Sequence, residues 1–183
     1  SAHLQPPAFP MPAEQAGILR DELARAVQAG VRYFAGLDFT GADFSGLDLR
    51  GVNFEGAWLE SANLEGANLS GANCARAVLA HARLGGMVAI GTRFAGANLG
   101  KATWAQSVCD EADFTGATLS HCDFTGTQMR RAVFTGAQLL ETLWGAADWS
   151  GARLAGQVFY RLKMVGMRWP EADLSACTFI ESD

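Results

Sequence analysis

Large apolar residues recur at every fifth position along most of the chain. From Phe34 to Phe179 each fifth residue is Phe, Leu, Trp, Met, Cys or Ala. The interval of 145 residues divided by five, with both ends counted, gives 30 such sites without a slip. A helix repeats its faces every ~3.6 residues and a strand every ~2, so neither element fits this spacing. The chain is therefore predicted to turn once in every unit of five.

Two other positions of the unit are also restricted. The residue two before each large apolar site is mostly small, as in Ala42 and Ala62, and the residue between them is often Asp or Asn. Gly often closes the unit, which suits a corner because Gly adopts positive φ without steric penalty. Four units then close a square coil of 20 residues with the small and large residues inside, and coils stack about 4.8 Å apart. We predict an all-β, four-sided parallel β-helix of about 7.5 coils over residues 31–183.

Residues 32–181 resemble the pentapeptide-repeat family, whose unit is a small residue, Asp or Asn, Leu or Phe, and two further residues. The run Ala-Asn-Leu-Glu-Gly-Ala-Asn-Leu-Ser-Gly at 62–71 follows this unit closely. Members of the family are right-handed quadrilateral β-helices, so the resemblance implies that hand. It implies little about function, because the same repeat serves unrelated roles.

Two segments precede the repeats. Residues 1–12 carry four prolines and are predicted to form an extended linker. Residues 13–30 place Leu19, Leu23 and Val27 on one face and charged residues on the other, which predicts an amphipathic helix that ends near a glycine. We expect this helix to cap the first coil, as solenoids need a cover over their ends, with docking of a partner as the alternative.

No comparable cover follows the repeats, since only four residues come after Phe179. The last coil is expected to present apolar side chains and an open β edge, which tends to recruit another strand. End-to-end homodimerisation, a further segment and simple fraying all remain open. The chain starts at Ser1 without a methionine, which suggests a processed protein or a piece of a longer one.

Candidate chemistry is sparse. The four cysteines are Cys74, Cys109, Cys122 and Cys177, and they fall on inward sites on four different sides of the shaft. They are predicted to be reduced and buried, to act as small apolar residues, and to bind no metal or cofactor. His81 and His121 share an outward corner column but lie two coils, near 10 Å, apart. That column is predicted to be a ladder of charged and polar residues on successive coils, and it holds His81, Lys101, His121, Glu141, Arg161 and Glu181. Asp110 and Glu111 lie one coil below two arginines and are likewise predicted to form stacked ion pairs. A filled rod also lacks the concave pocket that catalysis needs, so we predict that the protein is not an enzyme.

Composition limits the partners. A net charge of -5, from 14 basic and 19 acidic residues, is too mild to indicate nucleic-acid binding. No apolar run approaches the roughly 20 residues that cross a bilayer, and no secretory leader opens the chain. We therefore expect a soluble protein, cytoplasmic or secreted with a larger assembly, that binds another protein.

Two surface features are candidate interfaces. A band of acidic residues is followed along the rod by a basic band from Arg76 to Lys101. The two bands are either uneven surface charge without a function or a bipolar docking surface. The acidic band consists of Asp38, Asp43, Asp48, Glu55, Glu60 and Glu65. Apolar residues also reach outward on one face, and a contiguous strip of this kind marks a candidate interface: they are Leu140, Val158, Tyr160, Ile180, Trp58 and Val78.

These observations favour a non-enzymatic protein-interaction or scaffold module. The order of a proline-rich segment, a helix and a repeat rod also resembles the C-terminal pentapeptide region of multidomain proteins found with bacterial type VI secretion systems. The alternative is a DNA mimic that binds a type II topoisomerase (gyrase), as pentapeptide proteins of the quinolone-resistance kind do. Against it, the acidic band spans less than two coils and is followed by a basic one.

Overall fold

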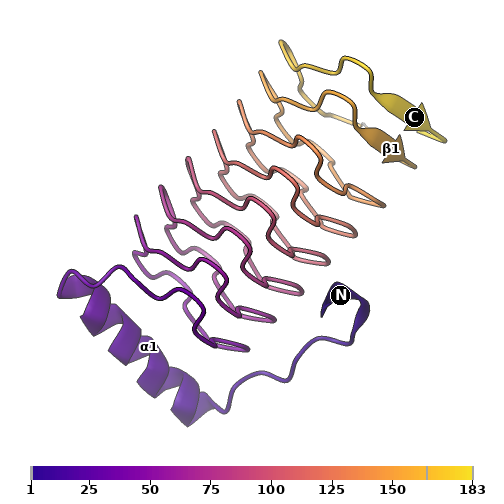
Figure 1. The fold of residues 1–183 in the computed structure, drawn as a ribbon. Coiled ribbons are helices and arrows are strands. Elements are labelled where there is room, and N and C mark those ends of the chain that lie inside the picture. The colour runs from indigo at the N-terminus through magenta and orange to yellow at the C-terminus, as the bar shows by residue number, and fades with distance from the viewer. Residues whose placement is uncertain (1, 164, 183) are drawn as a thin grey trace.

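The computed structural model describes residues 2–163 and 165–182. Met164, one of the predicted inward sites, and the end residues Ser1 and Asp183 lie outside the described residues. The chain forms a straight rod of stacked coils, with one helix across its first end and two short strands at the other (Figure 1). In order, the elements are the 3-10 turn η1 (Ala2–Leu4), the helix α1 (Ala13–Gln28) and the strands β1 (Val158–Tyr160) and β2 (Thr178–Ile180).

Successive coils pair in parallel at an offset of 20 residues. The pairing begins at Tyr33 with Asn53 and continues to Arg153 with Asp173, and β1 pairs with β2 at the same offset. Each unit contributes two or three residues to the ladder before the chain turns, so most of the rod is bridged without forming long strands. The predicted 20-residue coil is therefore confirmed.

A left-handed residue forms every corner. In most units the small residue donates its N–H to the carbonyl of the large apolar residue three earlier, as Ala42 does to Phe39 at 3.0 Å. The third residue of that turn has positive φ, which fits a type II turn. Of the 30 corners from 36 to 181, 14 are not glycine, Ala146 at φ 55° among them. The coil thus requires a left-handed backbone conformation at every corner, even where the residue is not glycine and this conformation is unfavourable.

Asp and Asn stabilise the same turns from the outside. Their Oδ1 atoms accept the backbone N–H two residues later, as Asp43 does from Ser45 at 3.0 Å and Asn53 from Glu55 at 2.9 Å. This local bond is the reason why the unit prefers these residue types. It also lowers the pKa of Asp38, whose carboxylate accepts the backbone N–H of Thr40.

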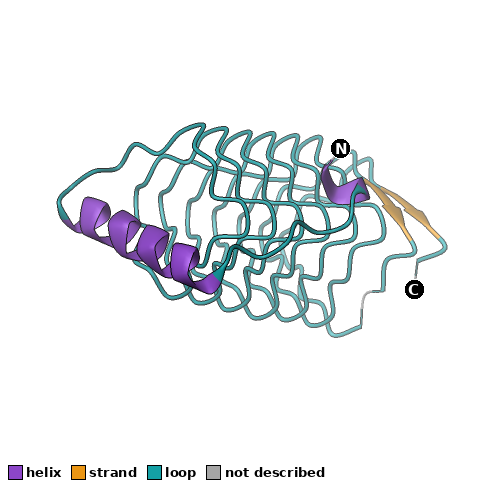
Figure 2. Cartoon of the chain, turned by 90° about the horizontal axis from the view of Figure 1, so that it is seen from below, coloured by secondary structure: helices purple, strands orange, loops and turns teal. Residues whose placement is uncertain are grey.

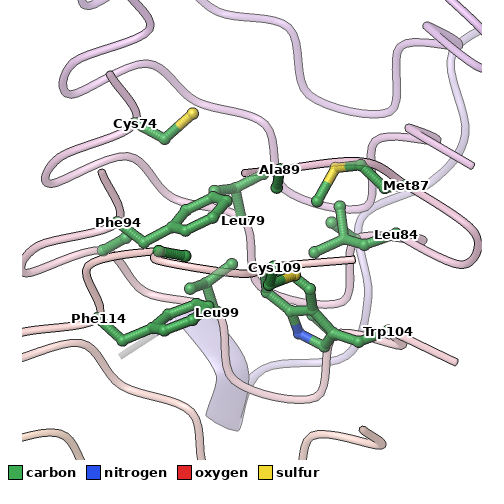
Figure 3. Packing of buried hydrophobic residues seen from close by; sticks show 14 of the residues in the cluster. Cys74, Leu79, Leu84, Met87, Ala89, Phe94, Leu99, Trp104, Cys109 and Phe114 are labelled. Carbon is green, nitrogen blue, oxygen red and sulfur yellow. The ribbon is translucent and has the colours of Figure 1, made fainter. Parts of the chain in front are cut away.

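The shaft is filled by stacked side chains. The predicted column of Trp104, Phe124 and Trp144 is present, with ring centroids 5.5 and 4.2 Å apart. On a neighbouring side Phe94 lies above Phe114 at 5.2 Å with nearly parallel rings (Figure 3). These rings are almost wholly removed from water, so burial of aromatic area is the main source of stability in the core.

Polar side chains at small inward sites follow one main rule. Most of them donate to the carbonyl of the large apolar residue 23 positions earlier, in the coil below: Thr92 to Leu69 at 2.7 Å, and Ser107 to Leu84 at 2.6 Å. Thr142 instead donates to Leu139 at 3.2 Å, within its own coil. A buried hydroxyl is tolerated because it is hydrogen-bonded. The small site can therefore accept Thr, Ser or Cys as well as Ala.

The helix α1 covers the first coil (Figure 2). Leu23 and Val27 are buried and belong to the same apolar cluster as Phe34 and Phe39. The helix ends at Gln28, two residues before the predicted boundary, because Gly30 already has a φ of 90°. Its apolar face thus supplies the cover that the open end of a solenoid needs.

The proline-rich segment lies along the side of the rod. Met11 donates its N–H to the carbonyl of Gly41 at 3.2 Å, and Nε2 of His81 lies 3.0 Å from the carbonyl oxygen of Gln5. Gly41 is needed for this approach, since a Cβ there would stand 2.8 Å from the carbonyl oxygen of Phe9. The segment predicted as a linker is thus attached at two points, over a hollow of about 550 Å³.

The last coil is more open than the others. Trp169 and Leu174 are only half-buried, and Phe179 is exposed although its ring stacks on Phe159 at 5.1 Å. Cys177 was predicted to be buried and is only partly so, because no further described coil covers its site. The expected exposure of inward apolar groups at this end is therefore present.

Candidate interaction surface

Exposed apolar side chains gather near the C-terminal end of one face. Leu140, Val158 and Ile180 are 48%, 56% and 43% exposed. The register of β1 and β2 places Tyr160 beside Ile180, and the guanidinium of Arg161 lies 4.7 Å above the Tyr160 ring. These four predicted residues, Leu140, Val158, Tyr160 and Ile180, form one surface patch, which we call the C-terminal apolar patch.

A hollow of about 510 Å³ opens within this patch. Leu140, Val158 and Tyr160 line it, together with Gln157 and neighbouring residues of the two coils. Leu143, which the sequence reasoning missed, is also 52% exposed on an adjoining side. Its outward position could have been read from the period of five, since it precedes the inward Trp144.

Trp58 and Val78 form a separate apolar pair. They are direct neighbours across two adjacent coils, and Trp58 is 52% exposed. The same column then continues through polar residues before it reaches Val158: Asn98, Thr118 and Gln138. The six predicted residues therefore occupy one face but make two patches and not a continuous strip.

The acidic band is largely paired with the basic residues beside it. Ion pairs join Glu55 to Arg76 and Glu65 to Arg83. Asp48 pairs with Arg50 at 2.6 Å, and Asp43 lies 3.8 Å from Arg20 of α1. Among the six acids, only Asp38 and Glu60 have no ion-pair partner in the described chain. Two acids are thus neutralised by the basic band and two by other arginines of the described chain.

The predicted charge ladders are present in part, because His81 contacts the carbonyl of Gln5 and Lys101 has no ion pair in the described chain. Glu111 pairs with Arg131 at 2.5 Å, and Arg161 with Glu181 at 2.8 Å. In the outward histidine column, Nδ1 of His121 lies 3.3 Å from Glu141. Exposed pairs of this kind contribute about 0–1 kcal/mol each.

Asp110 differs from the other acids because its side chain is buried. The carboxylate accepts the backbone N–H of Arg130 at 2.9 Å and its guanidinium at 2.5 Å. The buried charge is thus compensated by an opposite charge and by hydrogen bonds. Asp110 has a structural role in joining two coils.

The reactive residue types do not converge. Cys74, Cys109 and Cys122 are separate, buried and free, and burial raises the pKa of the Cys74 and Cys122 thiols to about 12. Over residues 2–163 and 165–182 there is no group of three or more side chains placed to hold a metal ion. In the same residues no helix has the length and apolar character to cross a membrane.

A family model described as pentapeptide repeats matches the chain in eight copies. The matched segments together span more than half of the chain, and they are residues 33–66, 57–93, 67–103, 92–130 and 112–142. No curated protein matches the chain.

Several solved structures are similar to the chain. A trypsin-treated variant of QnrB1, a plasmid-mediated fluoroquinolone resistance protein, is 19% identical over 75% of this chain and 77% of its own, with a TM-score of 0.53. Two proteins of Nostoc PCC 7120 also match. The pentapeptide-repeat protein alr5209 is 18% identical over 96% of this chain and 99% of its own, with a TM-score of 0.42. HetL, involved in heterocyst differentiation regulation, is 24% identical over 86% of this chain and 93% of its own, with a TM-score of 0.30. The family match and the QnrB1 likeness confirm the predicted right-handed, four-sided parallel β-helix.

Proposed function

The chain belongs to the pentapeptide-repeat family, and from this premise we propose that it is a non-enzymatic module that binds a protein partner through the C-terminal apolar patch. The observation that carries the proposal is the exposure of Leu140, Val158 and Ile180 around a hollow of about 510 Å³. Contiguous exposed apolar area of this kind is typical of interaction sites, whereas single exposed residues are not.

The arrangement of charge supports an apolar contact. Most acids of the acidic band are paired within the chain, as Glu55 is with Arg76 and Glu65 with Arg83, so they offer little unbalanced charge to a partner. Apolar and aromatic residues at the centre of an interface with polar residues around it supply most of the binding energy. The C-terminal apolar patch has this composition, with Tyr160 at its centre and the Arg161–Glu181 pair at its edge.

The setting that we propose is an assembly or adaptor role in a bacterial type VI secretion system, where the rod helps to load or position a secreted component. The support is the order of the elements, a proline-rich segment, the helix α1 and then the rod. If this setting is right, deleting the module from its host reduces secretion of one component, and secretion at the wild-type level contradicts it.

The same charge pairs weaken the alternative of a DNA mimic, which needs unpaired acids at the spacing of phosphates. Asp38 and Glu60 alone of the six acids stay without an ion pair in the described chain. A gyrase supercoiling assay separates the two functions. Inhibition or protection of gyrase at micromolar protein would favour the mimic over the interaction module.

The experiment that tests the proposal is affinity capture from host extract with the full chain as bait. Tyr160→Asp and Val158→Asp each place a charge in the C-terminal apolar patch and are expected to reduce recovery of a specific partner at least about tenfold, the equivalent of ~1.4 kcal/mol. Thr118→Asp, in the same outward column two coils away, is the matched control and is expected to leave recovery unchanged. Equal recovery with all three variants, at unchanged thermal stability, would reject the patch.

A further inference from the structure

The ladder between coils is interrupted inside the C-terminal apolar patch, and the interruption continues onto the next side, where Trp144 does not donate to the carbonyl of Lys163. One coil lower, Leu119 donates to Gln138 at 2.9 Å and His121 to Leu140 at 2.8 Å. The equivalent bonds from Leu139 and Glu141 to β1 are missing, as is the bond from the Val158 N–H to the carbonyl of Ala137, although the structure describes all these residues. We call this gap, between residues 136–141 and 155–160, the seam.

The residues at the small inward sites give the cause. Gln157, Leu162 and Met167 occupy three successive small sites of one coil, where the coil below has Ala137, Thr142 and Ala147. A single large residue at such a site is accommodated, since Met87 is buried and the ladder bonds of Val88 are intact. Three in succession crowd the shaft and favour a shift of the backbone, because protein cores are close-packed. The coil that contains β1 stays hydrogen-bonded to β2 and separates from the coil below.

Gln157 holds the seam open from within. Its side-chain amide donates to the carbonyl of Phe134, following the same 23-residue rule by which Thr127 donates to Trp104 at 3.1 Å. Glutamine reaches that carbonyl over a longer side chain than threonine, so the bond forms at a larger separation of the two coils. Gln157 also lines the hollow.

The seam leaves eight backbone groups of the described chain without a ladder bond across the gap, and two of them are the N–H of Gly136 and the carbonyl of Ala155. The others are, on the lower side, the N–H groups of Leu139 and Glu141 and the carbonyl of Ala137, and on the upper side the N–H of Val158 and the carbonyls of Val158 and Tyr160. Backbone groups of this kind are almost always paired in folded proteins. Here they are gathered at a hollow with an apolar rim.

We propose that the seam is the docking slot of the partner, and that it takes an extended, apolar peptide segment whose backbone pairs with these free groups and whose central side chain enters the hollow. This inference rests on the proposed function and specifies the partner's chemistry. Free donors and acceptors on neighbouring backbones select a β-type ligand, as in strand addition to a sheet edge. The rim of Leu140, Val158 and Tyr160 selects apolar side chains, because no charged side chain lines the hollow.

The first test measures the seam in the full chain without any partner. Amide exchange followed by NMR is expected to be at least about tenfold faster at Leu139 and Glu141 than at Leu119 and His121, because only the latter pair is in the ladder. Gln157→Thr keeps the bond to Phe134 with a shorter side chain, so it is expected to slow exchange at Leu139 and Glu141. Equal protection at all four amides in the wild type would overturn the inference.

The second test uses a fluorescein-labelled probe peptide, acetylated Thr-Val-Phe-Val-Thr amide, and a control peptide with proline in place of the central phenylalanine. The probe is expected to bind the wild-type chain and to slow exchange at Leu139 and Glu141, and Gln157→Thr is expected to weaken binding at least about tenfold. Gln128→Ala, an exposed glutamine two coils below that of Gln157 and not among the residues that line the hollow, is the control and should bind the probe normally.

The outcomes separate this inference from the proposed function. Equal binding of the probe to the wild type and to Gln157→Thr, or no binding to the wild type at millimolar peptide, would overturn the docking slot. In either case loss of the cellular partner with Tyr160→Asp would still support the C-terminal apolar patch as the interface. Loss of the probe with Gln157→Thr, at equal or higher thermal stability of that variant, would support the slot.

Discussion

Replacing Ala146 with glycine is expected to stabilise the protein, although it removes atoms. Ala146 is exposed at a corner with φ 55°, a conformation that costs an L-residue about 1–2 kcal/mol. Glycine avoids this cost but loses about 0.5–1 kcal/mol more conformational entropy on folding. The difference predicts that Ala146→Gly raises the free energy of unfolding by about 0.5–1 kcal/mol.

The reverse change at an equivalent corner has the opposite sign. Gly46 has φ 66°, and a Cβ added there meets nothing within 4 Å, so Gly46→Ala tests backbone strain without a steric clash. It is expected to destabilise by about 1 kcal/mol. Ala105, one residue before a corner and without a positive φ, is the control: Ala105→Gly should also destabilise, by about 0.5–1 kcal/mol.

Urea unfolding of the full chain, followed by tryptophan fluorescence, measures all three variants. A change of 1 kcal/mol corresponds to about 2–4 °C in Tm for a protein of this size, which calorimetry resolves. If Ala146→Gly is neutral or destabilising while Ala105→Gly behaves as expected, the corners are not strained and the reasoning is refuted.

Three further predictions concern the core, the acidic turns and the thiols. Phe114→Ala is expected to destabilise the protein by about 3–5 kcal/mol in the same urea assay, because it removes a fully buried ring, and a loss below 1 kcal/mol would contradict the packing. The hydrogen bonds that Arg50 donates to Asp48, first from its side chain and then from its backbone N–H, lower the pKa of Asp48 to about 2. The contribution of the Asp48 carboxylate to stability is therefore complete above pH ~4 and is lost as the pH falls towards 2. Asp48→Asn should flatten the dependence of Tm on pH in that range. Ellman's reagent at pH 8 is expected to label only Cys177 quickly in the native protein, since burial raises the pKa of the Cys74 thiol to about 12; fast labelling of more than one thiol would show that the shaft opens.

Much of the fold could be predicted from the sequence, because the residues of each five-residue unit determine the conformation of that unit through local contacts. The large apolar residue, the small residue and the Asp or Asn that accepts the N–H two residues later all act within one unit or between neighbours 20 apart. Repetition makes these local preferences add up along the rod. The predicted stacking of Phe124 on Trp144 and of Glu111 under Arg131 followed from the same count.

The interaction surface could be predicted only in part. Outward positions such as Leu140 and Val158 are read directly from the period, but whether they join Trp58 in one strip depends on what fills the coils between them. Leu143 was not predicted as part of the surface because it lies on an adjoining side, outside the two outward columns of the predicted strip. The large residues at small sites, Gln157 above all, were visible in the sequence, yet their effect on the backbone was not.

What the sequence by itself determined is the coil: its length, its inside and outside, and the chemistry of its turns, since these depend on contacts within a unit or one coil away. The tertiary structure alone decided which acids are neutralised, because Glu55 could meet Arg76 only once the side-chain paths across the surface were fixed. It also decided that residues 9–11 lie against Gly41, and that the ladder opens beneath Val158. Those features depend on many weak contacts between segments, and the residue type at any one position of the repeat does not predict the sum of those contacts.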